Sequence, residues 1–88
     1  MHLLVSYDIK LPKRLRKVHR TMLAYGRPLQ YSVFECALKP AQLEALRHEL
    51  AALIDHEEDS VLILSFGPTC ITLGCRPPLL AQPHLFLD

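Results

Sequence analysis

The chain has no tryptophan, only three glycines and no long apolar run, and each absence narrows what the protein can be. Its apolar stretches fall far short of the ~20 residues that span a bilayer, so we expect no membrane-spanning helix. We also expect no secretory signal, because the start of the chain has no charged leader and no small-residue cleavage site. The three cysteines are an odd number, which argues against a disulfide framework and is typical of the reducing cytoplasm.

Acidic residues are scarce in the first part of the chain. Residues 1–34 contain seven Lys or Arg and a single acid, Asp8, whereas residues 35–88 contain three Lys or Arg and eight Asp or Glu. A basic half of this kind is typical of proteins that bind a polyanion, and nucleic acid is the natural candidate. The alternative is that the two halves pair their charges on an ordinary surface.

Apolar periodicity divides the chain into strands and helices of a single domain. Helices are expected to begin at Pro12 and Pro40, because proline suits the first helical position, and Gly26 is expected to cap the first of them. Strands are expected at residues 2–9, 29–38, 60–66 and 71–74, with a last strand-like patch at 84–87. This order predicts an α+β sandwich, in which two helices cover one face of a mainly antiparallel sheet.

The apolar patch Leu85-Phe86-Leu87 follows a proline-rich spacer. It either folds back onto an edge of its own sheet or pairs with the edge of a neighbouring chain. Half of the residues are apolar, a large share for so small a core, which favours an oligomer. We therefore expect a homodimer that uses the sheet and this patch, and we expect deletion of residues 84–88 to weaken it.

Asp8 ends the first expected strand, and six cations follow it over residues 10–20. A carboxylate that faces such a cluster can hold a divalent metal against a phosphate. Mg²⁺ needs only one or two carboxylates when waters and a substrate phosphate complete its octahedron, and a two-fold dimer would supply a second copy of Asp8. The plain alternative is that Asp8 begins a turn or caps the first helix.

The far side of the first helix carries a basic face, made of Lys13, Arg16, Lys17 and Arg20. We expect duplex nucleic acid to bind along it, largely without regard to sequence, although a charged solvent face is the commoner role of such residues. Arg14 lies nearer the apolar stripe and could be structural.

Several other side chains allow two interpretations. The aromatic residues Tyr7, Tyr31 and Phe34 could stack on bases, but core or dimer packing is the commoner role of strand aromatics. His19 lies beside the basic face and could act as a general acid or base, yet we expect all five histidines at the surface. We expect the cysteines to be free thiols, because no His or Cys pair completes a zinc site. Residues 56–59, His-Glu-Glu-Asp, predict a solvated turn.

Four stretches, taken in order, resemble the CRISPR-associated Cas-two family, the small subunits of the spacer-acquisition module. They are Tyr7-Asp8-Ile9, the basic run 13–18, Tyr25-Gly26, and residues 30–35, Gln-Tyr-Ser-Val-Phe-Glu. The resemblance implies a ferredoxin-like fold and a homodimer. It also implies an endonuclease that uses Mg²⁺ or Mn²⁺ on RNA or DNA and that binds the CRISPR integrase. The family's metal-binding aspartate falls on Asp8, its basic helix residues on Arg14, Arg16 and Lys17, and its strand-two aromatic on Phe34.

The sequence departs from the family pattern in two places. Family members often carry one or two further acids directly after Tyr-Asp-Ile, where this chain has Lys10-Leu11-Pro12. Family members commonly have an arginine two residues before the Gln of the Gln-Tyr-Ser-Val-Phe-Glu stretch, where this chain has Pro28. The arginine here is one position earlier, Arg27, and we keep it among the nucleic-acid-binding candidates. Both departures weaken the case for hydrolysis more than the case for the fold. The missing acids favour the alternative to the nuclease, a non-catalytic nucleic-acid and protein scaffold of the same fold. A toxin-type endoribonuclease and a small-molecule regulatory domain are further alternatives for this fold.

The family fold also places a strand pair between its helices. Ten residues, 29–38, are few for two strands, so we interpret them as one long or bent strand, and a pair of strands is the open alternative.

Overall fold

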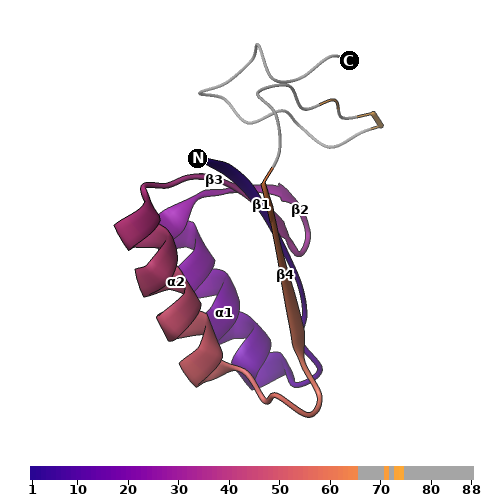
Figure 1. Ribbon diagram of the computed structural model, residues 1–88. Coiled ribbons are helices and arrows are strands. Elements are labelled where there is room, and N and C mark those ends of the chain that lie inside the picture. The colour runs from indigo at the N-terminus through magenta and orange to yellow at the C-terminus, as the bar shows by residue number, and fades with distance from the viewer. Residues whose placement is uncertain (66–70, 72, 75–88) are drawn as a thin grey trace.

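The computed structural model describes residues 1–65, 71, 73 and 74, and shows a sheet with both helices on one of its faces (Figure 1). The elements, in order, are β1 (His2–Asp8), α1 (Pro12–Tyr25), β2 (Arg27–Gln30), β3 (Val33–Ala37), α2 (Pro40–Leu53) and β4 (Ser60–Ser65). The strands lie in the order β2-β3-β1-β4, and every neighbouring pair is antiparallel. This is the predicted ferredoxin-like sandwich, and both helices begin at the predicted prolines.

Of the two possibilities for residues 29–38, the preferred one, a single long or bent strand, is wrong, and the open alternative of two strands is found. The segment is a hairpin, in which β2 and β3 are joined by a two-residue turn at Tyr31 and Ser32. In the described part of the chain no residue other than glycine has a positive φ, so this turn needs neither glycine nor asparagine. The sequence therefore carries no turn signal at this point, and the fourth strand of the sheet comes from this hairpin.

The strand expected at 71–74 is also not formed where the structure describes it. Residues 71, 73 and 74 belong to no strand, and Gly74 has a φ of 102°, which is outside the range of strands. The expected strand-like patch at 84–87 lies outside the described residues. Cys70 and Cys75 lie outside them as well.

Alternation along β1 gives the sheet two different faces. Leu3, Val5 and Tyr7 are buried beneath the helices, whereas Leu4, Ser6 and Asp8 point to the other side. In β3, Phe34 and Cys36 join this core, and Glu35 between them is buried as well. The helices complete the core with four buried residues, Val18 and Met22 of α1 and Leu46 and Leu50 of α2.

The open face of the sheet, which no helix covers, carries exposed leucines. Leu62 is 55% exposed and Leu64 is 48% exposed, and in the register of the sheet Leu64 lies opposite Leu4 and Leu62 lies opposite Ser6. Two large aliphatic side chains in one short strand at this exposure form an apolar surface. Neither helix of the described region has the length and apolar character needed to cross a membrane.

Gly26 caps α1, as predicted, through its N–H, which donates to the carbonyl oxygen of Met22 at 2.9 Å. Its backbone is extended, so the requirement for glycine comes from space and not from φ. A Cβ at this position would overlap the carbonyl oxygen of Glu35 and the sulfur of Cys36. The absence of a side chain therefore lets the end of α1 approach β3 closely.

Candidate functional site

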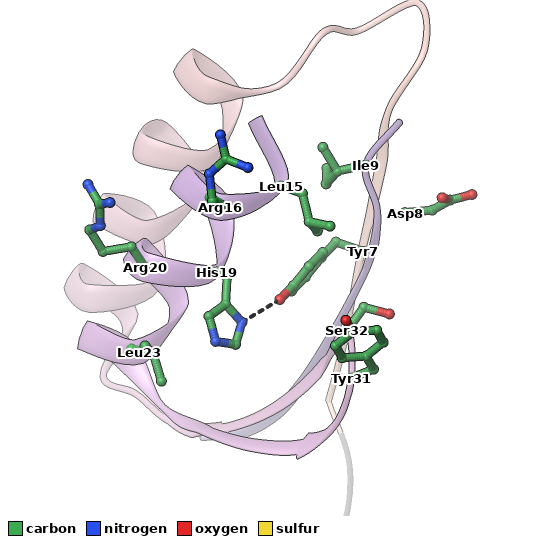
Figure 2. Close-up of a pocket in the computed structure, with 10 residues that line it drawn as sticks. All are labelled: Tyr7, Asp8, Ile9, Leu15, Arg16, His19, Arg20, Leu23, Tyr31 and Ser32. Carbon is green, nitrogen blue, oxygen red and sulfur yellow. Dashed lines mark hydrogen bonds between the residues drawn. The ribbon is translucent and has the colours of Figure 1, made fainter. Parts of the chain in front are cut away.

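Asp8 lies at the end of β1 and points away from α1 (Figure 2). Its side chain is 67% exposed, and its Oδ2 accepts a hydrogen bond from Lys10 Nζ at 3.1 Å. The prediction that Asp8 faces the cations of α1 is therefore wrong, because strand alternation puts Tyr7, not Asp8, on the helix side. Asp8 is available to an external ligand on the open face.

The described residues contain no group of three or more His, Cys, Asp or Glu side chains that could hold a metal ion. Within the described chain, Asp8 therefore offers a single carboxylate. Carboxylate oxygens are the hard ligands that Mg²⁺ prefers, but one carboxylate must be supplemented by waters, a substrate phosphate or a second protomer. Asp8 can therefore bind a divalent cation when other ligands of these kinds complete the coordination.

Asp59 organises the connection that carries Asp8 into α1. Its side chain is fully buried and accepts hydrogen bonds from Arg14 Nε at 2.7 Å, Arg14 Nη2 at 3.2 Å, Lys10 N at 2.9 Å and Asp55 N at 2.8 Å. The guanidinium of Arg14, helped by the two backbone N–H groups, holds the pKa of the Asp59 carboxyl well below its usual range. The predicted solvated turn at 56–59 is therefore wrong for Asp59.

Arg14 is engaged within the protomer. Besides Asp59, it donates to Glu58 Oε1 at 2.9 Å, and both acids raise the pKa of its guanidinium above the ordinary value. Of the two roles considered for Arg14, the structure therefore gives it the structural one. The sequence shows an acid, Asp59, directly before β4, but it does not show that this acid is buried or which arginine it contacts. The pairing of Asp59 with Arg14 could therefore not be predicted.

We expect Asp59→Asn to lower the thermal unfolding midpoint at pH 7 by about 10 °C or more, because the partly buried guanidinium of Arg14 keeps its charge and loses its buried anionic partner. The wild type should lose this stabilisation as pH falls below about 4, where the unfolded carboxyl protonates while the folded one resists. The variant should be less sensitive to acid over the same range. Calorimetry at several pH values measures both effects, with Glu57→Gln, an exposed neighbour, as the control. Equal acid sensitivity of the two proteins would contradict this role of Asp59.

The basic face of α1 is exposed as predicted. Within the region that the structure describes, Lys13, Arg16, Lys17 and Arg20 form no ion pair. Arg27 lies elsewhere, at the start of β2 and opposite Glu35 in the register. The structure thus places five of the six predicted nucleic-acid-binding cations on α1. Four of them form its exposed basic face, whereas Arg14 is engaged by Glu58 and Asp59, and Arg27 lies on β2.

The three candidate aromatic residues have different surroundings. Phe34 is fully buried and Tyr7 nearly so, and their stacked rings lie 6.2 Å apart between centroids. Core packing, the commoner of the two roles considered, is therefore the role of both in this structure. Tyr31 is 84% exposed on the hairpin turn and is free to contact a ligand.

The sequence predicted that His19 lies at the surface, but in the structure His19 is half-buried. Its ring meets Phe34 edge to face at 5.4 Å, and its Nδ1 lies 3.2 Å from the hydroxyl of Tyr7. Burial raises the pKa of the Tyr7 phenol. Cys36 is a free, buried thiol, as expected, and desolvation raises its pKa to about 11.

A groove of about 560 Å³ runs between α1 and the β2–β3 turn (Figure 2). Tyr7 and His19 lie in its middle, with Arg16 and Arg20 on the helix side and Tyr31 on the turn. Leu15 and Leu23 give the helix wall an apolar character. Sequence reasoning missed this groove because its walls are residues far apart along the chain, brought together only by the fold.

The domain is ferredoxin-like, because its strands lie in the order β2-β3-β1-β4 and both helices cover one face of the sheet. It also carries a cationic helix and an exposed carboxylate at the end of β1. A family profile described as "CRISPR associated protein Cas2" matches residues 1–72. The chain therefore belongs to the Cas2 family, and the resemblance stated from the sequence is confirmed.

Relatives in sequence carry nuclease names. The chain is 48% identical over 64 residues to the CRISPR-associated endoribonuclease Cas2 1 of Rhodospirillum rubrum, and the match covers 73% of this chain but only 63% of that protein. It is 38% identical over 96 residues to the CRISPR-associated endonuclease Cas2 of Halalkalibacterium halodurans, covering 98% of this chain and all of that one.

Solved structures agree with the fold. Cas2 of Streptococcus pyogenes superposes with a TM-score of 0.72 at 39% identity, covering 76% of this chain and 87% of that one. A hypothetical protein of Thermus thermophilus superposes with a TM-score of 0.83 at 34% identity, covering 88% and 94%.

Proposed function

We propose that the protein is a metal-dependent endoribonuclease of the CRISPR spacer-acquisition module, and that it acts as a homodimer bound to the CRISPR integrase. The observation that carries the proposal is Asp8, an exposed carboxylate at a strand end on a sheet face that also carries Leu62 and Leu64. The names of the relatives in Rhodospirillum rubrum and Geobacter sulfurreducens, both endoribonucleases, support RNA as the substrate.

The homodimer forms through the open face in this proposal. Burial of an exposed leucine side chain contributes roughly 1.5–3 kcal/mol when it is complete, so several of them on a self-complementary face favour association. Asp8 lies on the same face, because it alternates with Leu4 and Ser6 along β1. A two-fold axis near β1 and β4 brings the two copies of Asp8 together.

Asp8 of each protomer would hold the Mg²⁺ or Mn²⁺ ion, with waters and the substrate phosphate as its other ligands. The ion supplies Lewis-acid polarisation of the phosphoryl group and a bound water of lowered pKa. The chain's own residues bind and orient the RNA, and the basic face of α1 draws the phosphates to the protein. Asp59 fixes the backbone of Lys10, so the end of β1 keeps its direction.

The second candidate is a nucleic-acid scaffold without catalysis. It is favoured by the single carboxylate of Asp8 and by the absence of any three-residue metal cluster among the described residues. Incubation of the purified protein with labelled single-stranded RNA and duplex DNA, in Mg²⁺, Mn²⁺ or EDTA, separates the two. The nuclease proposal expects RNA cleavage that EDTA stops, whereas binding without cleavage under any metal supports the scaffold.

We expect the double substitution Arg16→Ala with Arg20→Ala to flatten the salt dependence of nucleic-acid binding. For duplex DNA, the slope of log affinity against log salt falls by roughly 0.9 for each lost phosphate contact, because fewer counterions are released. Arg47→Ala, on the exposed side of α2, is the matched control. Fluorescence anisotropy at several salt concentrations measures the slope, and an unchanged slope removes this face from the interface.

A further inference from the structure

The groove between α1 and the β2–β3 turn is not used by the chemistry assigned to Asp8. Although the backbone end of β1 contributes to its lining, the carboxylate of Asp8 points away from it (Figure 2). Its volume of about 560 Å³ lies in the range of small-ligand sites, roughly 300–1,000 Å³. The groove therefore needs an explanation of its own.

The middle of the groove is held by packing. Tyr7 and His19 are joined by a 3.2 Å hydrogen bond, and both rings contact the fully buried Phe34. Side chains fixed in this way lose little freedom when a ligand binds, which favours binding. The floor of the groove, made by Tyr7 and His19, is thus preformed in the free chain.

The walls combine a flat aromatic surface with positive charge. Tyr31 presents its ring from the turn and is 84% exposed, while Leu15 and Leu23 face the groove from the helix. Arg16 and Arg20 lie one helical turn apart at the edge of the groove on α1, with their guanidinium groups turned outward from His19, and neither forms an ion pair within the described region (Figure 2). A complementary ligand is flat and apolar over one part and anionic at another.

We propose that this groove binds one unpaired nucleotide of the RNA substrate, with its base against Tyr31 and the leucines and its phosphate on Arg16 and Arg20. The inference rests on the proposed function for its choice of RNA. A paired base cannot enter, because its faces are covered by its neighbours in the duplex and its edge is occupied by its partner. An acidic peptide with an apolar anchor shares part of this chemistry, but a nucleotide matches the exposed ring and the paired arginines together.

The test uses a short single-stranded RNA that carries one fluorescent aminopurine base, titrated with protein in EDTA so that no cleavage occurs. Stacking on Tyr31 should quench the base, and Tyr31→Ser should weaken binding about tenfold and remove the quench, as expected for one lost stacking contact. Tyr31→Phe keeps the ring and should bind within about twofold of the wild type. Because Tyr31 is exposed on a turn, none of these variants should disturb the fold.

Two comparisons define the site. Leu23→Asp should weaken binding of the same RNA, whereas Leu11→Asp, an exposed leucine outside the groove, should not. A fully paired duplex with the same fluorescent base should bind without any change that depends on Tyr31. Tighter binding of the corresponding single-stranded DNA than of the RNA would overturn the choice of RNA.

The outcomes also separate this inference from the proposed function. The nucleotide subsite is overturned if Tyr31→Ser and Leu23→Asp bind RNA as tightly as the wild type and quench the fluorescent base to the same extent. This holds even if the protein cleaves RNA. Loss of integrase binding in these variants with unchanged RNA binding overturns it in favour of a protein-docking groove. Quenching that depends on Tyr31 supports the subsite even if Mg²⁺ produces no cleavage, a result that would count against the nuclease alone.

Discussion

Asp8→Asn should reduce Mg²⁺-dependent RNA cleavage by at least about a hundredfold, because the metal's contribution to the barrier is worth several kcal/mol. No other carboxylate lies in the first thirty-four residues to replace it. The substitution keeps the size of the side chain and removes its charge, so its effect reports on metal binding. Cleavage of labelled RNA, measured at increasing Mg²⁺ and Mn²⁺ concentrations, gives both the rate and the metal dependence.

The fold should not change in Asp8→Asn. The Asp8 side chain is 67% exposed, and among the described residues it forms a surface ion pair with Lys10, a kind of pair that contributes roughly 0–1 kcal/mol. An unchanged unfolding midpoint and an unchanged dimer therefore accompany the loss of cleavage. Glu57→Gln serves as the charge-matched control and should cleave like the wild type. Equal cleavage by Asp8→Asn and the wild type would place the activity at another site or in a contaminant.

Leu62→Arg should dissociate the proposed homodimer, with an increase of at least about a hundredfold in its dissociation constant. The side chain lies on the open face, so in the dimer a charge would be placed between two apolar sheet surfaces without a partner. Cleavage should fall with it, because each protomer would keep only one Asp8. Light scattering or sedimentation across a range of concentrations measures the association.

The matched control for Leu62→Arg is Leu11→Arg. Leu11 is similarly exposed in the protomer but precedes α1 and does not lie on the open face. It should leave the dimer intact. A wild-type protein that is monomeric at all concentrations would contradict the dimer, and an intact dimer in Leu62→Arg would move the interface to another surface.

Much of the fold could be predicted because its signals are local. The prolines at positions 12 and 40 mark the starts of the helices, and the apolar runs of β1 and β4 read clearly as strands. The hairpin of β2 and β3 was missed because its turn uses ordinary backbone angles and common residues. The two strands are defined by the pairing of β2 with β3 and of β3 with β1, contacts that the sequence of the turn does not reveal.

The site was predictable only in part, for a related reason. Asp8 and the basic face of α1 follow from position and helical spacing, and the structure exposes all of them. The direction of Asp8 could not be predicted, because it depends on which face of β1 the helices cover. The partnership of Arg14 and Asp59 joins residues 45 positions apart, and the groove depends on a turn that the sequence does not mark.

Tyr7 and Asp8 are neighbours in β1, yet they serve opposite sides of the sheet: one belongs to the groove and the other to the open face. A shift of one residue in the pairing of β1 would exchange them, placing a carboxylate in the core and a phenol in solvent. β1 is paired on both sides, with β3 and with β4, which fixes its register. We therefore expect a single-residue insertion or deletion in β1 to abolish both sites at once, whereas the same change beyond Lys10 would leave the alternation intact.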